Sequence, residues 1–185
     1  YVGMSHPFAL GADGLVSGGL NDPCAAWHRD LLARAKQYGF EIILSLSYEL
    51  LDMHCPEAWK QRAADGSPAL TGWVPPSALL SPANDAAMAW VREIALAFAA
   101  LAAEAGQRVR LQVGEPWWWV RPDGTICLYD AAAVSAFAPV PIADLRAPLD
   151  AAQKATLDAA GKVLADSTAA LCAAVRSAHP AAQTL

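Results

Sequence analysis

The chain has 185 residues, 55% of them hydrophobic, and its 18 acidic and 13 basic side chains give a net charge of −5. This apolar content excludes an intrinsically disordered chain. The acidic balance and the lack of any Lys/Arg cluster argue against a nucleic-acid-binding protein. We also expect no membrane partner, because no stretch approaches the ~20 apolar residues that span a bilayer.

The four cysteines are scattered, and no CxxC pair occurs among Cys24, Cys55, Cys127 and Cys172. This spacing argues against a zinc ribbon and a dense disulfide framework, and it favours free, buried or half-buried thiols. Asp52, His54 and Cys55 are of metal-ligand type, but no second cluster completes a site. We therefore expect no metal and no cofactor.

The N-terminal quarter predicts strand, loop, helix and strand in turn. Residues 1–5 form a short β-prone run that ends before a proline, and the glycines within 11–19 predict a loop. A helix is expected over 23–39, opened by a first-turn proline and ended by a glycine. The nearly continuous apolar run over 40–46 predicts a strand buried on both faces of a parallel sheet.

A long excursion, 52–82, follows this strand and contains a predicted short helix over 56–64. Loops of this length are usually functional. A second helix is expected to open near Asn84 and to stop at Gly106, and the segment 108–114 is the next predicted strand.

The C-terminal part repeats the pattern. A second excursion over 120–150 contains a Pro-Asp-Gly turn, a helix is expected over 151–178, and the last four residues predict the entry to a further strand. Connections into strands are short and connections out of them are long, as in (β/α)₈ barrels, whose active face lies at the strand ends. The lack of a Gly-rich phosphate loop disfavours a Rossmann fold. The predicted fold is α/β with parallel strands, a partial TIM barrel formed by one domain over 1–185 of a longer chain.

Glu115 is the strongest candidate for chemistry, because it directly follows a predicted buried strand. A carboxylate flanked by tryptophans would be partly desolvated, with a raised pKa, as a general acid requires. A salt bridge to Arg110, to Arg121 or to an arginine of another β/α unit of the longer chain is the alternative. Glu49, at the end of the preceding strand, is the second catalytic candidate, since paired carboxylates hydrolyse glycosides.

Aromatic and polar side chains near the same strand ends form the predicted substrate-binding set: Trp117, Trp118, Trp119, His6, Tyr48 and Trp73. Consecutive side chains of an extended segment alternate, so the three adjacent tryptophans cannot all face one core. Flat aromatic faces stack on sugar rings, and packing beneath the long loop is the rival interpretation. The histidine could bind a hydroxyl or be structural.

The segment Val113–Pro116, VGEP, resembles the Asn-Glu-Pro that closes the fourth strand in the large clan of retaining (β/α)₈ glycoside hydrolases, which includes cellulases and β-galactosidases. The resemblance implies that Glu115 is the acid/base. Gly114 replaces the asparagine that contacts the sugar 2-hydroxyl in that clan, and the clan's nucleophile would lie beyond Leu185. By this resemblance, segments 1–5, 41–48 and 108–114 correspond to strands two, three and four.

A second resemblance covers nearly the whole chain. The segments MSHPF, WHRDLLARAKQYGFEIILSLSYELLDMHCPEAW, DGSPALTGWVPPSALLSPAN, VGEPWWW and CLYDAAA resemble the TIM-barrel domain of bacteriophage and prophage tail proteins of the non-contractile sheath type. It implies a virion location, or the bacterial cytoplasm when expressed from a prophage, with other tail subunits and a glycan as partners. Three functions stay open: a carbohydrate-engaging tail domain without demonstrated hydrolysis, an active retaining glycoside hydrolase, and a purely structural virion component.

Overall fold

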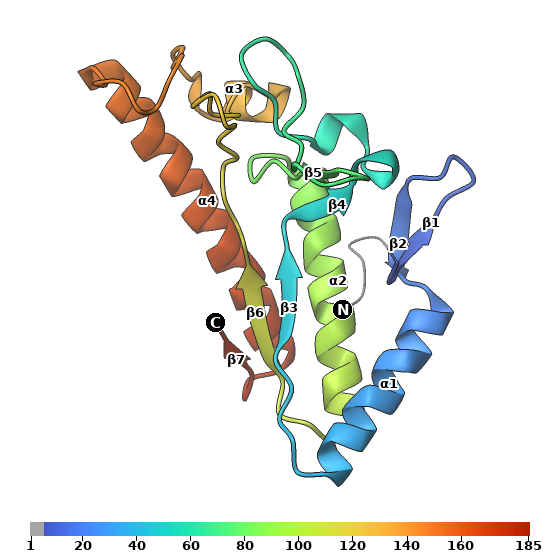
Figure 1. Ribbon diagram of the computed structural model, residues 1–185. Helices are drawn as coiled ribbons and strands as arrows, with labels where there is room; N and C mark the ends of the chain where they lie inside the picture. The colour runs from blue at the N-terminus through green and yellow to red at the C-terminus, as the bar shows by residue number, and fades with distance from the viewer. Residues whose placement is uncertain (1–5) are drawn as a thin grey trace.

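The computed structural model describes residues 6–185 and shows a mixed α/β chain (Figure 1). The strands are β1 (Phe8–Leu10), β2 (Val16–Leu20), β3 (Leu44–Ser47), β4 (Glu49–Leu51), β5 (Ser77–Leu79), β6 (Arg110–Gly114) and β7 (Gln183–Thr184). The α-helices are α1 (Asp22–Gln37), α2 (Asp85–Glu104), α3 (Ala131–Phe137) and α4 (Ala151–Ala178), and two 3₁₀ turns span Asp52–His54 and Glu57–Trp59.

Three strands form a parallel sheet in the order β3-β6-β7, so the predicted parallel α/β architecture is confirmed. In Figure 1, β3 and β6 run side by side in the same direction, α4 passes behind β6, and α2 stands next to β3. The register pairs Ser47 with Gly114, so both strands end at the same level. No barrel is closed within residues 6–185.

The two faces of this sheet differ in chemistry because side chains alternate along a strand. Leu46 and Leu111 point toward the main core, where Ile94 of α2 is also buried. Ser45 and Gln112, which are paired in the register, lie on the opposite face and are exposed. The expectation of a strand buried on both faces is therefore wrong, since only one face is covered by described residues.

The long helices agree closely with their sequence signals. Side-chain oxygens of Asn21, Asn84 and Asp150 accept a backbone N–H at the start of α1, α2 and α4, as N-cap residues do. The last helix spans Ala151–Ala178, the predicted range, and β7 forms the predicted further strand.

Helix α2 corrects one sequence expectation. By length and composition alone it is long and apolar enough to cross a membrane. Half of its apolar window is buried inside the fold, however, and Trp90, Val91 and Phe98 belong to the main core. In this fold α2 is therefore the central core helix.

Several short elements differ from the prediction. The expected glycine loop over 11–19 is largely an antiparallel hairpin of β1 and β2, and α3 lies within the predicted second excursion. The expected helix over 56–64 is only the single 3₁₀ turn Glu57–Trp59 followed by extended chain. The first excursion also contains β5, which pairs antiparallel with β4. The strand predicted for residues 1–5 lies outside the described residues.

Candidate functional site

A hollow of about 730 Å³ runs along β3, where residues 42–47 line it, and extends to Gly114 and Glu115 at the end of β6. It lies between the sheet, α1 and the first excursion, so long loops border it as the sequence predicted. Glu49, Glu115 and Trp73 of the predicted site residues line it. The hollow thus brings together both predicted catalytic carboxylates and one of the predicted aromatic side chains.

Glu115 lies one residue beyond β6 and is exposed at the mouth of this hollow. Its backbone has φ 50°, in the left-handed region that side chains other than glycine rarely adopt. Position 114 has no room for the side chain of an asparagine, because a Cβ there would lie 2.6 Å from Oγ of Ser45. The backbone at Gly114 therefore packs tightly against β3, whereas the side chain of Glu115 is exposed.

Glu49 is the more buried carboxylate, with only 6% of its surface exposed at the start of β4. Burial is the main cause that raises its pKa, the negative charge of Glu115 adds to the shift, and together they bring the pKa to about 7. No hydrogen bond or ion pair to its carboxyl group occurs within residues 6–185. The group therefore faces the hollow with its hydrogen-bonding capacity unused.

The salt bridges considered as alternatives for Glu115 involve other carboxylates. Arg110 pairs with Glu41 at 2.6 Å, and Arg121 lies 3.6 Å from Asp65. The ion pairs of these two arginines are thus with other carboxylates, and no lysine or arginine occurs among the described residues that line the hollow.

The walls of the hollow are largely apolar and aromatic. Trp73 is 49% exposed and is held by a hydrogen bond from Nε1 to Oγ of Ser77 at 3.4 Å. Trp27 of α1 is 51% exposed and also lines the hollow. Its ring packs edge-on against His28, whose Nδ1–H donates to the Cys24 carbonyl. The role of Trp27 could not be predicted, because helical spacing shows which residues share a face of the helix but not which part of the protein packs against that face.

The three adjacent tryptophans alternate as predicted, and none of them lines the hollow. Trp118 is buried against Phe137, and its Nε1 donates to the Ala160 carbonyl at 2.9 Å. Trp119 is half-buried, whereas Trp117 is 42% exposed with its ring centre 6.3 Å from that of Trp119. Packing therefore accounts for Trp118, and a sugar platform remains open only for the exposed Trp117 and the half-buried Trp119.

Tyr48 and His6 lie away from the hollow's lining. Tyr48 is fully buried, and its hydroxyl lies 3.2 Å from Oγ of Ser167 on α4. His6 is exposed, and its backbone carbonyl accepts hydrogen bonds from Asn21 and Cys24 at the start of α1. Their observed contacts are structural, so their predicted role in substrate binding stays a prediction.

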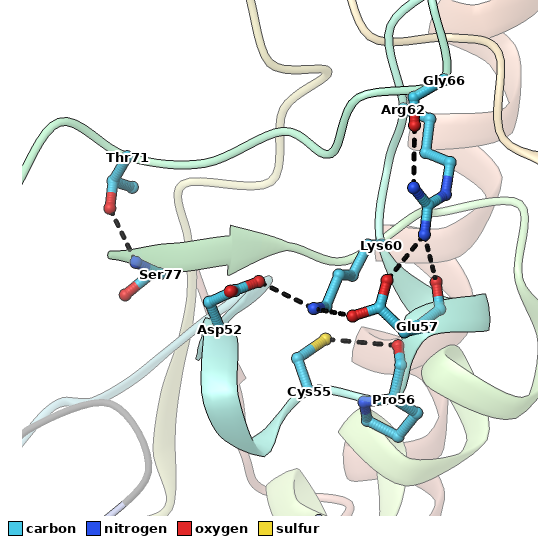
Figure 2. Close-up of polar contacts among 9 residues, drawn as sticks. All are labelled: Asp52, Cys55, Pro56, Glu57, Lys60, Arg62, Gly66, Thr71 and Ser77. Carbon is cyan, nitrogen blue, oxygen red and sulfur yellow. Dashed lines mark hydrogen bonds and ion pairs between the residues drawn. The ribbon is translucent and has the colours of Figure 1, made fainter. Parts of the chain in front are cut away.

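An ion-pair cluster fixes the excursion that carries Trp73 (Figure 2). Buried Lys60 contacts Asp52 at 2.7 Å and Glu57 at 2.5 Å. Burial alone would lower the pKa of Lys60, but the hydrogen bonds to these two carboxylates outweigh it and the pKa is raised. Arg62 then joins Glu57 to the Gly66 carbonyl, so the cluster ties successive turns of the excursion together.

The comparison with protein families decides where this fold belongs. The model of the TIM-barrel domain of non-contractile tail sheath proteins matches residues 1–185. The chain belongs to this family. It is thus part of a structural component of a phage tail, located in the virion, with other tail subunits as partners. No curated protein and no solved structure matches the chain.

Proposed function

We propose that this tail sheath domain binds a glycan in the hollow beside β3. The observation that carries the proposal is the buried, unpartnered Glu49 beside Glu115 in a hollow of about 730 Å³. Sites for small molecules are typically concave and apolar, with a few polar groups that fix the ligand's orientation. Carboxylates accept hydrogen bonds from sugar hydroxyls, and the exposed rings of Trp73 and Trp27 offer faces for sugar rings.

The polar face of the sheet adds neutral hydrogen-bonding groups to this hollow. Ser45, Ser47 and Gln112 all line it and come from two adjacent strands. Hydroxyl and amide groups both donate and accept, which suits the hydroxyls of a saccharide. This combination of neutral polar groups, carboxylates and aromatic rings favours a glycan over a purely apolar ligand.

Hydrolysis is the second candidate, and the unequal environments of the two glutamates favour it. A retaining or inverting glycosidase needs one carboxyl group protonated and the other ionised. The pKa of about 7 allows Glu49 to hold a proton near neutrality, and Glu115 is exposed to solvent. The raised pKa favours Glu49 as the proton donor. The resemblance to glycoside hydrolases instead implies that Glu115 is the acid/base.

A glycan array of bacterial surface polysaccharides tests binding with the full chain. We expect retention of at least one glycan, and Trp73→Ala should weaken it about tenfold, because stacking faces contribute on the order of 1 kcal/mol. Trp117→Ala is the matched control, since it removes an equally exposed ring outside the hollow. No retained glycan, or equal loss in the two variants, would contradict the proposal and leave a purely structural tail component.

Aryl glycosides test hydrolysis separately. If the pair is catalytic, Glu49→Gln and Glu115→Gln should each reduce turnover by at least ~10²-fold. Turnover that survives both substitutions would remove the pair from any mechanism, and the absence of turnover with intact binding would leave a binding site.

A further inference from the structure

The charges that line the hollow are all of one sign. Among the described residues that line it, Glu49 and Glu115 are the acidic side chains, and no lysine or arginine is present. His28 is the other titratable group there. Its ring packs against Trp27 and Phe98, and its Nδ1–H is engaged by the Cys24 carbonyl.

Three basic side chains of the surrounding segments are paired with other carboxylates. Arg29, which follows His28, pairs with Glu104. Arg110, on the strand that leads to Glu115, pairs with Glu41, and Lys60, in the excursion, is held by Asp52 and Glu57. An anionic ligand in the hollow would therefore meet two carboxylates and none of these positive side chains. Like charges at such close quarters cost binding free energy, because a partly desolvated site screens them poorly.

Glu49 has no polar partner within the described residues, and a ligand could provide one. The residue as a whole is more than nine-tenths buried, and its carboxyl group makes no hydrogen bond or ion pair within residues 6–185. Buried charges are normally paired, since an unpaired carboxylate in a site of low dielectric is unfavourable. A ligand cation placed between Glu49 and Glu115 would pair both carboxylates at once and reduce their mutual repulsion.

We propose that the hollow selects a glycan carrying free ammonium groups, an amino sugar without N-acetylation, over neutral glycans and excludes anionic ones. This inference rests on the proposed glycan-binding function. The ammonium donates to Glu49 and Glu115, while Ser45, Ser47 and Gln112 bind the neutral hydroxyls. The aromatic side chains contact the faces of the sugar rings equally in cationic, neutral and anionic glycans.

Three tetrasaccharides of similar size test the selection: glucosamine tetraose, N-acetylglucosamine tetraose and galacturonic acid tetraose. Their affinities for the full chain are measured by calorimetry just above pH 7, where Glu49 with its pKa of about 7 is largely ionised, and at low salt, with a chelator present to exclude metal bridging. We expect the glucosamine oligomer to bind at least about tenfold more tightly than the N-acetylated one, and the galacturonate not to bind. The preference should shrink at high salt, which screens charges.

Charge-matched variants assign the preference to the hollow. Glu49→Gln and Glu115→Gln should each weaken binding of glucosamine tetraose more than that of N-acetylglucosamine tetraose, and so reduce the preference severalfold. Glu93→Gln removes the same charge from the exposed surface of α2 and should leave the preference intact. Equal loss in Glu93→Gln would show a nonspecific attraction to the acidic chain and overturn the inference.

The outcomes separate the two proposals. Equal affinity for all three tetrasaccharides, or tighter binding of galacturonate, overturns the charge selection and leaves glycan binding in place. Tight binding of the N-acetylated oligomer alone likewise overturns the charge selection but not glycan binding. Failure of all three sugars to bind, together with an empty glycan array, overturns both proposals.

Discussion

Replacing Glu49 by glutamine removes the ionisable group with the least favourable surroundings in the hollow. Its folded-state pKa of about 7 lies above the ordinary value of 4.5. The folded chain therefore binds this proton more tightly than the unfolded chain does. It follows that wild-type stability falls as pH rises from about 4.5 to about 7 and that the loss is complete above that range.

The magnitude follows from the same pKa. A tenfold change in an ionisation equilibrium corresponds to about 1.4 kcal/mol, so the difference between 4.5 and about 7 corresponds to at most about 3 kcal/mol. Glutamine has nearly the same shape and no charge, so it avoids this cost. Glu49→Gln should therefore raise the free energy of unfolding by about 2–3 kcal/mol well above pH 7 and change it little near pH 4.

Urea unfolding at several pH values measures the effect, with Glu93→Gln as the control for the lost surface charge. In the same series, Glu115→Gln should lower the pKa of Glu49 as followed by NMR, but not to 4.5, because burial is the larger cause. Equal stability of Glu49→Gln and wild type above pH 8, with the control also unchanged, would refute the argument that the carboxyl group is buried and unpaired.

Two further substitutions test the packing around the site. Trp118→Ala should destabilise the chain by about 3–5 kcal/mol, as loss of a buried aromatic side chain does, whereas Trp117→Ala should cost about 1 kcal/mol or less; similar urea midpoints for the two would contradict the observed burial. Gly114→Ala should cost about 1–3 kcal/mol, because the new Cβ meets Oγ of Ser45. Adding Ser45→Ala should recover most of that loss, and the absence of such recovery in thermal unfolding would place the strain elsewhere.

The long elements of this fold could be predicted because their signals are local. The range of α4 follows from its helical periodicity and the capping box formed by Asp150 and Gln153. The strand before Glu115 follows from its alternating apolar residues and the abrupt Pro116 after it. Both depend on residues adjacent in sequence, which is why they are confirmed.

The short elements could not be predicted, because distant residues stabilise them. Phe8 of β1 packs edge-on against Trp90 of α2, and the Trp90 indole donates to the Gly18 carbonyl of β2. These contacts hold a glycine-containing hairpin that has weak strand propensity by itself. The seven residues of α3 likewise depend on their Asp130 cap and on burial of Ala133.

The candidate site was partly accessible from the sequence. The positions of Glu49 and Glu115 next to strand ends were predicted, and because β3 and β6 end at the same level, both residues line the same hollow. Which glutamate is buried, and that Trp27 rather than Trp118 faces the hollow, depends on how α1 and the excursion pack. These contacts join residues far apart in the sequence, so no periodic pattern of residues predicts them.

The left-handed backbone of Glu115 has a consequence for the natural variation of this family. At such a position glycine is the least strained residue, and asparagine or aspartate is tolerated better than glutamate. A lineage in which the carboxylate had lost its purpose would thus be expected to drift toward glycine at this site. The residue found at this position in relatives would therefore indicate whether the carboxylate is retained despite its backbone strain.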